Sequence, residues 1–289
     1  MDRKWGAIMV FDFLKKRLQI EDDNSQINHR SVLVSVSTDS GIIREVNEDN
    51  FFVTGIGYKT SDSASFNIKI NADSISFFSV FDGMGGEAYG EEASKIAAET
   101  LKEFADKIST KKAKRINLKE SIEQYIHVAN SRICDMVIRN RCKRSGCTMA
   151  LTVINNGIVY PFSVGDSRIY RVSAGTIEQI SEDQTLAVKK LKANIYNEEE
   201  ARTSSDAHKL TSYIGSDDRG VGVSYHSYDP FPLSDSILLL CSDGLTDMCT
   251  DKEILDTIYA DSVSPSASLV KEAIKNGGED NVTCVVINY

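Results

Sequence analysis

Apolar residues at every second position predict the first strand of the chain, at residues 31–37. Val32, Val34 and Val36 lie on one face of that stretch, as expected for a strand with one buried side. Continuous apolar runs rich in β-formers predict further strands at 51–56, 75–81, 237–241 and 282–287.

A different spacing, close to the helical period, predicts two consecutive helices. Apolar residues recur three or four positions apart over 91–108 and again over 118–138. Pro265 predicts the start of a later, shorter helix, which the glycines at 277 and 278 end.

Two tight turns predict antiparallel strand pairs. Strands expected at 148–154 and 158–164 are joined by Asn155-Asn156-Gly157, and a second pair is expected to meet at Ala174-Gly175. Hairpins together with two adjacent helices argue against repeated strand–helix–strand crossovers. The pattern therefore favours an α+β fold in which helices pack outside antiparallel sheets.

Composition narrows the function further. The 289 residues carry 33 Lys and Arg against 42 Asp and Glu, a net charge of −9, which makes a dedicated nucleic-acid binder improbable on electrostatic grounds. No apolar run approaches the ~20 residues of a membrane span. The six cysteines include no C-x-x-C pair and read as reduced thiols, so we expect a cytoplasmic protein.

The chain divides into a short segment and one long domain. Residues 1–30 are expected to be an N-terminal leader or docking segment, and no linker interrupts residues 31–289. We expect 31–289 to be a single catalytic domain and the protein to be a monomer.

Acidic residues stand where apolar strands begin or end. Asp49 precedes one predicted strand, Asp82 and Asp243 each follow a strand and precede a glycine, and Asp280 precedes the last strand. An isolated Asp-Gly pair is more often a simple turn. Several such carboxylates at one sheet edge, however, would repel one another unless cations lay between them.

The residue types indicate which cations. Carboxylates and backbone carbonyls without a His or Cys set favour hard ions such as Mg²⁺ or Mn²⁺. Arg44, in the loop before Asp49, offers the planar fork that binds a phosphate dianion. Metal ions, shared carboxylates and an arginine are typical of phosphoester hydrolysis.

Six motifs, in this order, resemble those of a known family. They are Thr38-Asp39-Ser40-Gly41 through Asn47-Glu48-Asp49, Val80-Phe81-Asp82-Gly83-Met84-Gly85-Gly86 with Gly90-Glu91-Glu92-Ala93-Ser94, Ser145-Gly146-Cys147-Thr148, Val164-Gly165-Asp166-Ser167-Arg168-Ile169-Tyr170, Ser242-Asp243-Gly244-Leu245 and Asp280-Asn281-Val282-Thr283. From about residue 31 to residue 289 the chain resembles the metal-dependent serine/threonine protein phosphatases of type 2C, in their compact bacterial form.

The resemblance implies a four-layer sandwich of two central antiparallel β-sheets flanked by α-helices, with two Mn²⁺ or Mg²⁺ ions at one end. Asp82 would bridge both ions, and the Gly83 carbonyl would bind one of them. Asp49, Asp243 and Asp280 would complete the ligand set.

Three further residues take roles from the same resemblance. Arg44 would bind the phosphate, Glu48 would hold metal-bound water, and Asp166 with Asp243 would hold a weaker third metal. The implied reaction is hydrolysis of phosphoserine and phosphothreonine in proteins by direct attack of a hydroxide that bridges the metals. Phosphorylated proteins would be the substrates, in a signalling pathway opposed to a Ser/Thr kinase.

Some positions depart from the family pattern. Met84, Glu87 and Gln184 stand where relatives often have histidine, so no histidine is placed by a motif to protonate the leaving group. The four histidines of the chain read as surface or loop residues. A catalytically silent phosphoprotein-binding scaffold of the same fold is the alternative, although none of its metal-binding aspartates is missing.

Overall fold

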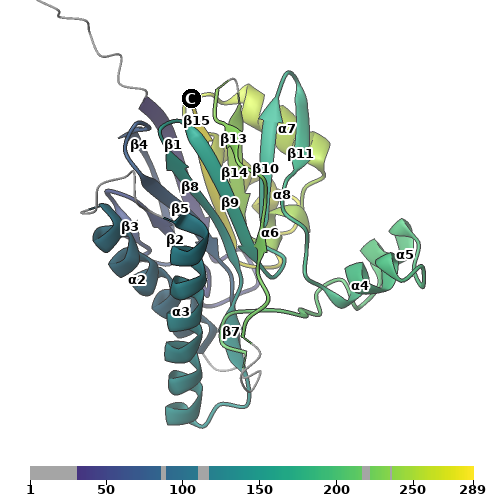
Figure 1. The fold of residues 1–289 in the computed structure, drawn as a ribbon. Coiled ribbons are helices and arrows are strands. Elements are labelled where there is room, and N and C mark those ends of the chain that lie inside the picture. Colours follow the sequence, from purple (N-terminus) through teal and green to yellow (C-terminus); the bar gives the residue numbers. More distant parts are fainter. Residues whose placement is uncertain (1–30, 86–88, 110–116, 217–221, 235) are drawn as a thin grey trace, which may run out of the picture. The chain divides into compact units, whose positions relative to one another are not determined.

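The computed structural model describes residues 31–85, 89–109, 117–216, 222–234 and 236–289. Residues 1–30, the expected leader, lie outside this range, as does Glu87. Most described elements belong to two antiparallel sheets with helices on their outer faces (Figure 1).

The first sheet has six strands, in the order β11-β10-β14-β15-β1-β4. Their bounds are β1 Ser31–Asp39, β4 Ala64–Asn71, β10 Arg168–Ser173, β11 Thr176–Gln179, β14 Ile237–Cys241 and β15 Val282–Asn288. All neighbouring strands run antiparallel, as the hairpin signals predict.

The second sheet runs in the order β12-β9-β8-β5-β2-β3, and β13 also pairs with β9. Its strands are β2 Asn50–Val53, β3 Gly57–Tyr58, β5 Ser76–Phe81, β8 Met149–Asn155, β9 Ile158–Val164, β12 His226–Ser227 and β13 Phe231–Pro232. A separate two-stranded sheet joins β6 (Gly83–Gly85) to β7 (Ser145–Cys147).

Helices cover both outer faces. One apolar cluster joins α2 (Tyr89–Ser109) and α3 (Leu118–Asn140) to the second sheet. Another joins α6 (Asp243–Thr246), α7 (Asp251–Ala260) and α8 (Pro265–Lys275) to the first sheet. Two short helices, α4 (Leu186–Lys192) and α5 (Glu198–Thr203), belong to the excursion between β11 and β12.

The core between the sheets explains the alternation in β1. Val32, Val34 and Val36 are fully buried in the cluster that joins the two sheets. The intervening Ser35 faces α8, where its hydroxyl lies 2.6 Å from that of Ser266. The result is the four-layer α+β sandwich that the sequence predicts.

Several predicted boundaries change. The strand expected at 51–56 ends at Val53, because the chain turns there and Gly55 takes a positive φ of 88°. The edge strand β4 and helix α7 were not predicted. Both expected hairpin turns are present, with positive φ at Asn156 and Gly157 and at Ala174 and Gly175.

The described part of the chain contains no helix with the length and apolar character to cross a membrane.

The packing of α3 makes a direct prediction about stability. Ile133 is a fully buried residue of this helix, whereas Ile138, five residues further on, is 73% exposed. We expect Ile133→Ala to lower the free energy of unfolding by about 2–5 kcal/mol because it leaves a cavity. Ile138→Ala should change it by less than about 0.5 kcal/mol. Urea denaturation in EDTA measures both, and equal losses would contradict this packing.

Candidate metal centre

The strand order brings four of the predicted acids to one end of the sandwich. Asp49 precedes β2 and Asp82 follows β5, and these neighbouring strands pair Asn50 with Phe81. In the other sheet Asp243 follows β14 and Asp280 precedes β15, again on paired neighbours. Because paired antiparallel strands begin and end at the same edge, each sheet contributes two carboxylates.

Hydrogen bonds join the acids across the two sheets. The Ser242 hydroxyl donates to Asp49 Oδ2 over 2.7 Å, linking the end of β14 to the start of β2. Asp82 and Asp243 share a hydrogen bond between their side chains. The backbone N–H of Asp82 donates to the Thr148 hydroxyl at 3.0 Å, which fixes the start of its loop.

Burial and nearby negative charge raise the pKa values of Asp49, Asp82 and Asp166. Burial raises the pKa of Asp49 to about 7, although the Ser242 hydroxyl opposes the shift. Burial and the neighbouring Asp243 also raise the pKa of Asp82 and of Asp166 well above their usual range. Burial acts in the same direction on Asp243, but hydrogen bonds from His208 and Asp82 outweigh it and lower that pKa.

Glu48 and Gly83 lie against the start of α2. Burial raises the pKa of Glu48, while Arg44 and the backbone N–H of Gly90 partly stabilise its charged form. A Cβ at Gly83 would lie 2.4 Å from the Glu48 carbonyl oxygen and 2.3 Å from that of Gly90. Glycine is therefore required at 83, because no side chain fits between these two carbonyl oxygens.

Arg44 lies at the rim, with 54% of its side chain exposed. Its Nη2 donates to Asp280 Oδ2 over 2.8 Å. The hydrogen bond and the charge of Asp280 both raise the pKa of Arg44. The arginine therefore reaches the acid cluster from the solvent side, with its guanidinium beside one predicted ligand.

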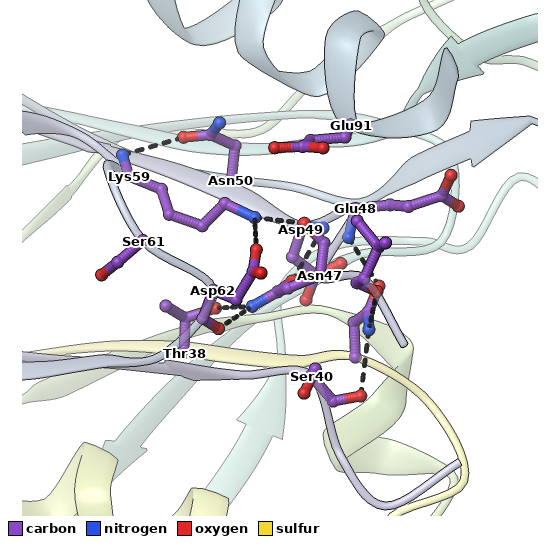
Figure 2. A network of polar contacts seen from close by, with 12 residues as sticks. Thr38, Ser40, Asn47, Glu48, Asp49, Asn50, Lys59, Ser61, Asp62 and Glu91 are labelled. Atoms are coloured by element: carbon purple, nitrogen blue, oxygen red, sulfur yellow. Dashed lines mark hydrogen bonds and ion pairs between the residues drawn. The ribbon is translucent and has the colours of Figure 1, made fainter. Parts of the chain in front are cut away.

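Figure 2 shows the polar network behind Asp49, in which Asn47 is central. Its amide nitrogen donates to the Thr38 hydroxyl at 2.8 Å and to the Asp62 carbonyl at 2.7 Å, and its Oδ1 accepts from the Asp49 N–H at 3.0 Å. Lys59 donates to the Asn47 carbonyl and lies 3.9 Å from Asp62 Oδ1. Burial lowers the pKa of Lys59, which sequence reasoning did not single out.

His208 and Asp247 also belong to the site, although no motif predicted them. His208 Nδ1 lies 3.9 Å from Asp243 Oδ2 and 3.6 Å from Asp247 Oδ2. The interaction with Asp243, supported by the charge of Asp247, raises the pKa of His208 to about 9. His208 is a turn residue with 61% of its side chain exposed, as the sequence predicts, but it lies beside the acid cluster. The only signal for Asp247 in the sequence is its position, four residues after Asp243.

A cavity of about 290 Å³ joins these residues to α4 and α5. Asp166 and Asp243 form its floor, and Val188, Leu191 and Ala201 line the side contributed by the excursion. Gln184, at the start of the excursion, accepts from the Gly165 N–H at 2.8 Å. The Gln184 side chain therefore has a structural role, holding the loop at Gly165, at a position where relatives often have histidine.

The donor set suits a hard divalent cation. Asp49, Asp82 and Asp243 offer only oxygen ligands, and burial beside other carboxyls raises the pKa values of Asp49 and Asp82. Among the described residues, the cationic groups near the acids are Arg44, Lys59, His208 and Arg168, and Arg168 is already paired with Asp183 at 2.7 Å. Divalent ions among the carboxylates would offset the repulsion, and oxygen-only ligation selects Mg²⁺ or Mn²⁺.

Comparisons with known proteins agree with this geometry. The sequence profile of the protein phosphatase 2C family matches residues 59–279. The serine/threonine phosphatase stp of Listeria welshimeri is 28% identical over 258 residues, which cover 86% of this chain and 93% of that protein.

Solved structures show the same architecture. The serine/threonine phosphatase of S. agalactiae superposes with a TM-score of 0.74 at 24% identity, covering 89% of this chain and 99% of that one. The catalytic domain of the phosphatase PstP, solved in complex with two manganese ions, gives a TM-score of 0.69 at 25% identity, covering 90% and 99%. The first likeness establishes the fold alone.

The candidate metal centre predicts that the stabilisation of the fold by bound metal depends on pH. A ligand at a hundredfold excess over its Kd adds about 2.7 kcal/mol, so saturating Mn²⁺ should raise the melting temperature by roughly 5–10 °C relative to EDTA. Asp49 has a raised pKa in the metal-free fold, so its favourable contribution there is complete below its usual pKa and is lost as pH rises through about 7. The difference between Mn²⁺ and EDTA should therefore widen from pH 5.5 to pH 8.

Thermal melts of wild type and Asp82→Asn measure this prediction. The substitution removes one predicted ligand charge and should shrink the Mn²⁺ shift. A shift that is unchanged in Asp82→Asn, or one that does not depend on pH in wild type, would place the metals elsewhere.

Proposed function

The chain belongs to the protein phosphatase 2C family of metal-dependent serine/threonine phosphatases, and we propose that it acts at the acid cluster around Asp82. The proposed reaction is hydrolysis of phosphoserine and phosphothreonine in proteins. The observation that carries this proposal is the convergence of buried carboxylates from both sheets, with Arg44 beside them on the solvent side.

We infer that two divalent ions bind between the sheets. Asp82 and the Gly83 carbonyl would hold them at the end of β5, and Asp49, Asp243 and Asp280 would complete the set. The two manganese ions of the PstP complex support this number. Asp166, with a raised pKa beside Asp243, would serve a weaker third ion. When bound, such ions supply a nucleophilic water at neutral pH and offset phosphoryl charge.

The protein's own residues then orient the substrate. Arg44 is exposed and, among the described residues, its ion-pair partner is Asp280, so its guanidinium can turn to the phosphoryl oxygens when that carboxylate binds metal. Glu48, held by the N–H of Gly90, is placed to accept a hydrogen bond from water between the acids and the phosphate. We propose direct attack of water on phosphorus without a phosphoenzyme.

The wider expectations stay proposals. Every residue assigned a role lies between 31 and 289, which supports this range as the catalytic domain and residues 1–30 as an accessory segment. A monomer in the cytoplasm that opposes a Ser/Thr kinase is consistent with this function. The silent scaffold is disfavoured because the acids are all present and repel one another as metal ligands would.

A direct assay tests the proposed function. Purified protein with Mn²⁺ should release phosphate from phosphoserine and phosphothreonine peptides, and EDTA should abolish the release. Asp82→Asn should reduce the rate by at least about a hundredfold, because removing one interaction made in the transition state commonly costs ~3 kcal/mol. A folded wild-type protein that binds Mn²⁺ without turnover would instead favour the scaffold.

Arg44 should act on the phosphate more than on the metals. Charge-assisted hydrogen bonds contribute roughly 1.5–3 kcal/mol each, so Arg44→Ala should lower kcat/KM by about tenfold to a few hundredfold, mainly through KM. Arg44→Lys should recover only part, since an ammonium cannot reproduce the two-pronged contact.

The Mn²⁺ dependence of activity is the matched readout for Arg44. We expect the Mn²⁺ concentration for half-maximal rate to stay within a few-fold of wild type. An unchanged KM with a shifted Mn²⁺ requirement would mean that the ion pair with Asp280 is the true role of this arginine.

A further inference from the structure

The loop that carries Arg44 also presents large apolar side chains to solvent. Ile42 is 63% exposed, Ile43 is 67% exposed and Val46 is 38% exposed. Ile42 and Ile43 are both large, apolar and exposed, and no other two consecutive residues in the described ranges share these properties. We call these two side chains the isoleucine pair.

The backbone around the isoleucine pair is held in place. The Ile42 N–H donates to the Gly278 carbonyl at 2.7 Å. The Asn281 side-chain amide donates at 3.0 Å to both the Ser40 and the Val46 carbonyls, closing the loop at its two ends. The exposed isoleucines therefore stand on a fixed support instead of folding back into the core.

Gly41 shows how close this support lies. Its φ is +76°, and a Cβ there would lie 2.4 Å from the Asp280 carbonyl oxygen and 2.6 Å from that of Gly278. The loop thus rests directly on the backbone that leads into β15. An apolar surface fixed in advance loses little conformational entropy when a ligand covers it, which favours binding.

The isoleucine pair is continuous with the proposed phosphate site. Ile43 is followed directly by Arg44, whose guanidinium reaches Asp280 in the acid cluster. Successive Cα atoms lie about 3.8 Å apart, so the isoleucine pair is within reach of substrate residues that flank a phosphoryl group held by Arg44. The apolar surface is therefore located where the residues beside a phosphosite would lie.

We propose that the isoleucine pair docks the protein substrate and selects phosphosites with a large aliphatic residue within two positions of the phosphoserine or phosphothreonine. This inference rests on the proposed function and adds a substrate preference to it. The occupant is an aliphatic side chain of the substrate, because only the substrate is brought to this place by the neighbouring phosphate contact.

Matched phosphopeptides test the preference. Short phosphoserine peptides, otherwise polar, carry either leucine or serine at each position within two residues of the phosphoserine, and kcat/KM is measured with Mn²⁺. Wild type should favour the leucine peptide at one or more of these positions by roughly fivefold to twentyfold, as expected for partial burial of aliphatic surface.

The ratio between the two peptides is then compared in variants. Ile42→Ser/Ile43→Ser should bring the ratio close to one, and Ile43→Ser alone should remove most of it, which covers the case in which the double variant does not fold. Val263→Ser is the matched control: its side chain is 68% exposed, in the turn between α7 and α8. This control should keep the wild-type ratio.

The outcomes distinguish a failure of this inference from a failure of the proposed phosphatase function on which it rests. Hydrolysis of both peptides at equal rates by wild type overturns the inference and leaves the phosphatase function standing. A preference that survives in Ile42→Ser/Ile43→Ser also overturns it. Sedimentation at the assay concentration is the last check, because a dimer that dissociates only in the double variant would assign the isoleucine pair to a second copy of the chain. Failure of wild type on every peptide overturns the function itself.

Discussion

Repulsion between buried carboxylates is the constraint on which the rest of the molecule depends. Asp49, Asp82 and Asp243 are drawn together by strands of two different sheets, and burial alone pushes their pKa values upward. The fold opposes that cost with hydroxyl donors such as Ser242 and with a few nearby cations, among them Arg168 and His208. It thereby retains a concentration of negative charge that hard divalent ions can offset, at the edge where the two sheets meet.

Two asparagines convert this edge into a defined site. Asn47 ties the turn before Asp49 to β1 through Thr38, while Asn281 accepts from the Glu48 N–H at 2.7 Å and holds the Arg44 loop through its other amide atom. Each amide donates and accepts at once, so one side chain fixes two segments that are far apart in the sequence. The phosphate-binding candidate and the metal ligands are consequently positioned by the same backbone.

Local sequence signals predicted much of this arrangement, and their limits have physical causes. The turns at Asn156-Gly157 and Ala174-Gly175 and the acids beside strands are short-range features, so they could be read directly. Strand β4 alternates Phe66, Ile68 and Ile70 with polar residues, a period-two signal that is present in the sequence although no strand was predicted from it. Lys59 and His208 acquire their roles through contacts with Asn47 and Asp243 that only the tertiary fold creates.

The contacts that hold the Arg44 loop in place are separate from the side chains that we propose select the substrate. The Arg44 loop is fixed through backbone carbonyls and N–H groups, by Gly278 and Asn281, and these contacts do not involve the side chains at 42 and 43. Those side chains face solvent, so they can differ between sequences without disturbing the acids or the arginine beside them. With the proposed roles, a buried acid cluster that tolerates little change, next to a fixed loop with exposed side chains, would let substrate preference vary while the metal chemistry stays the same.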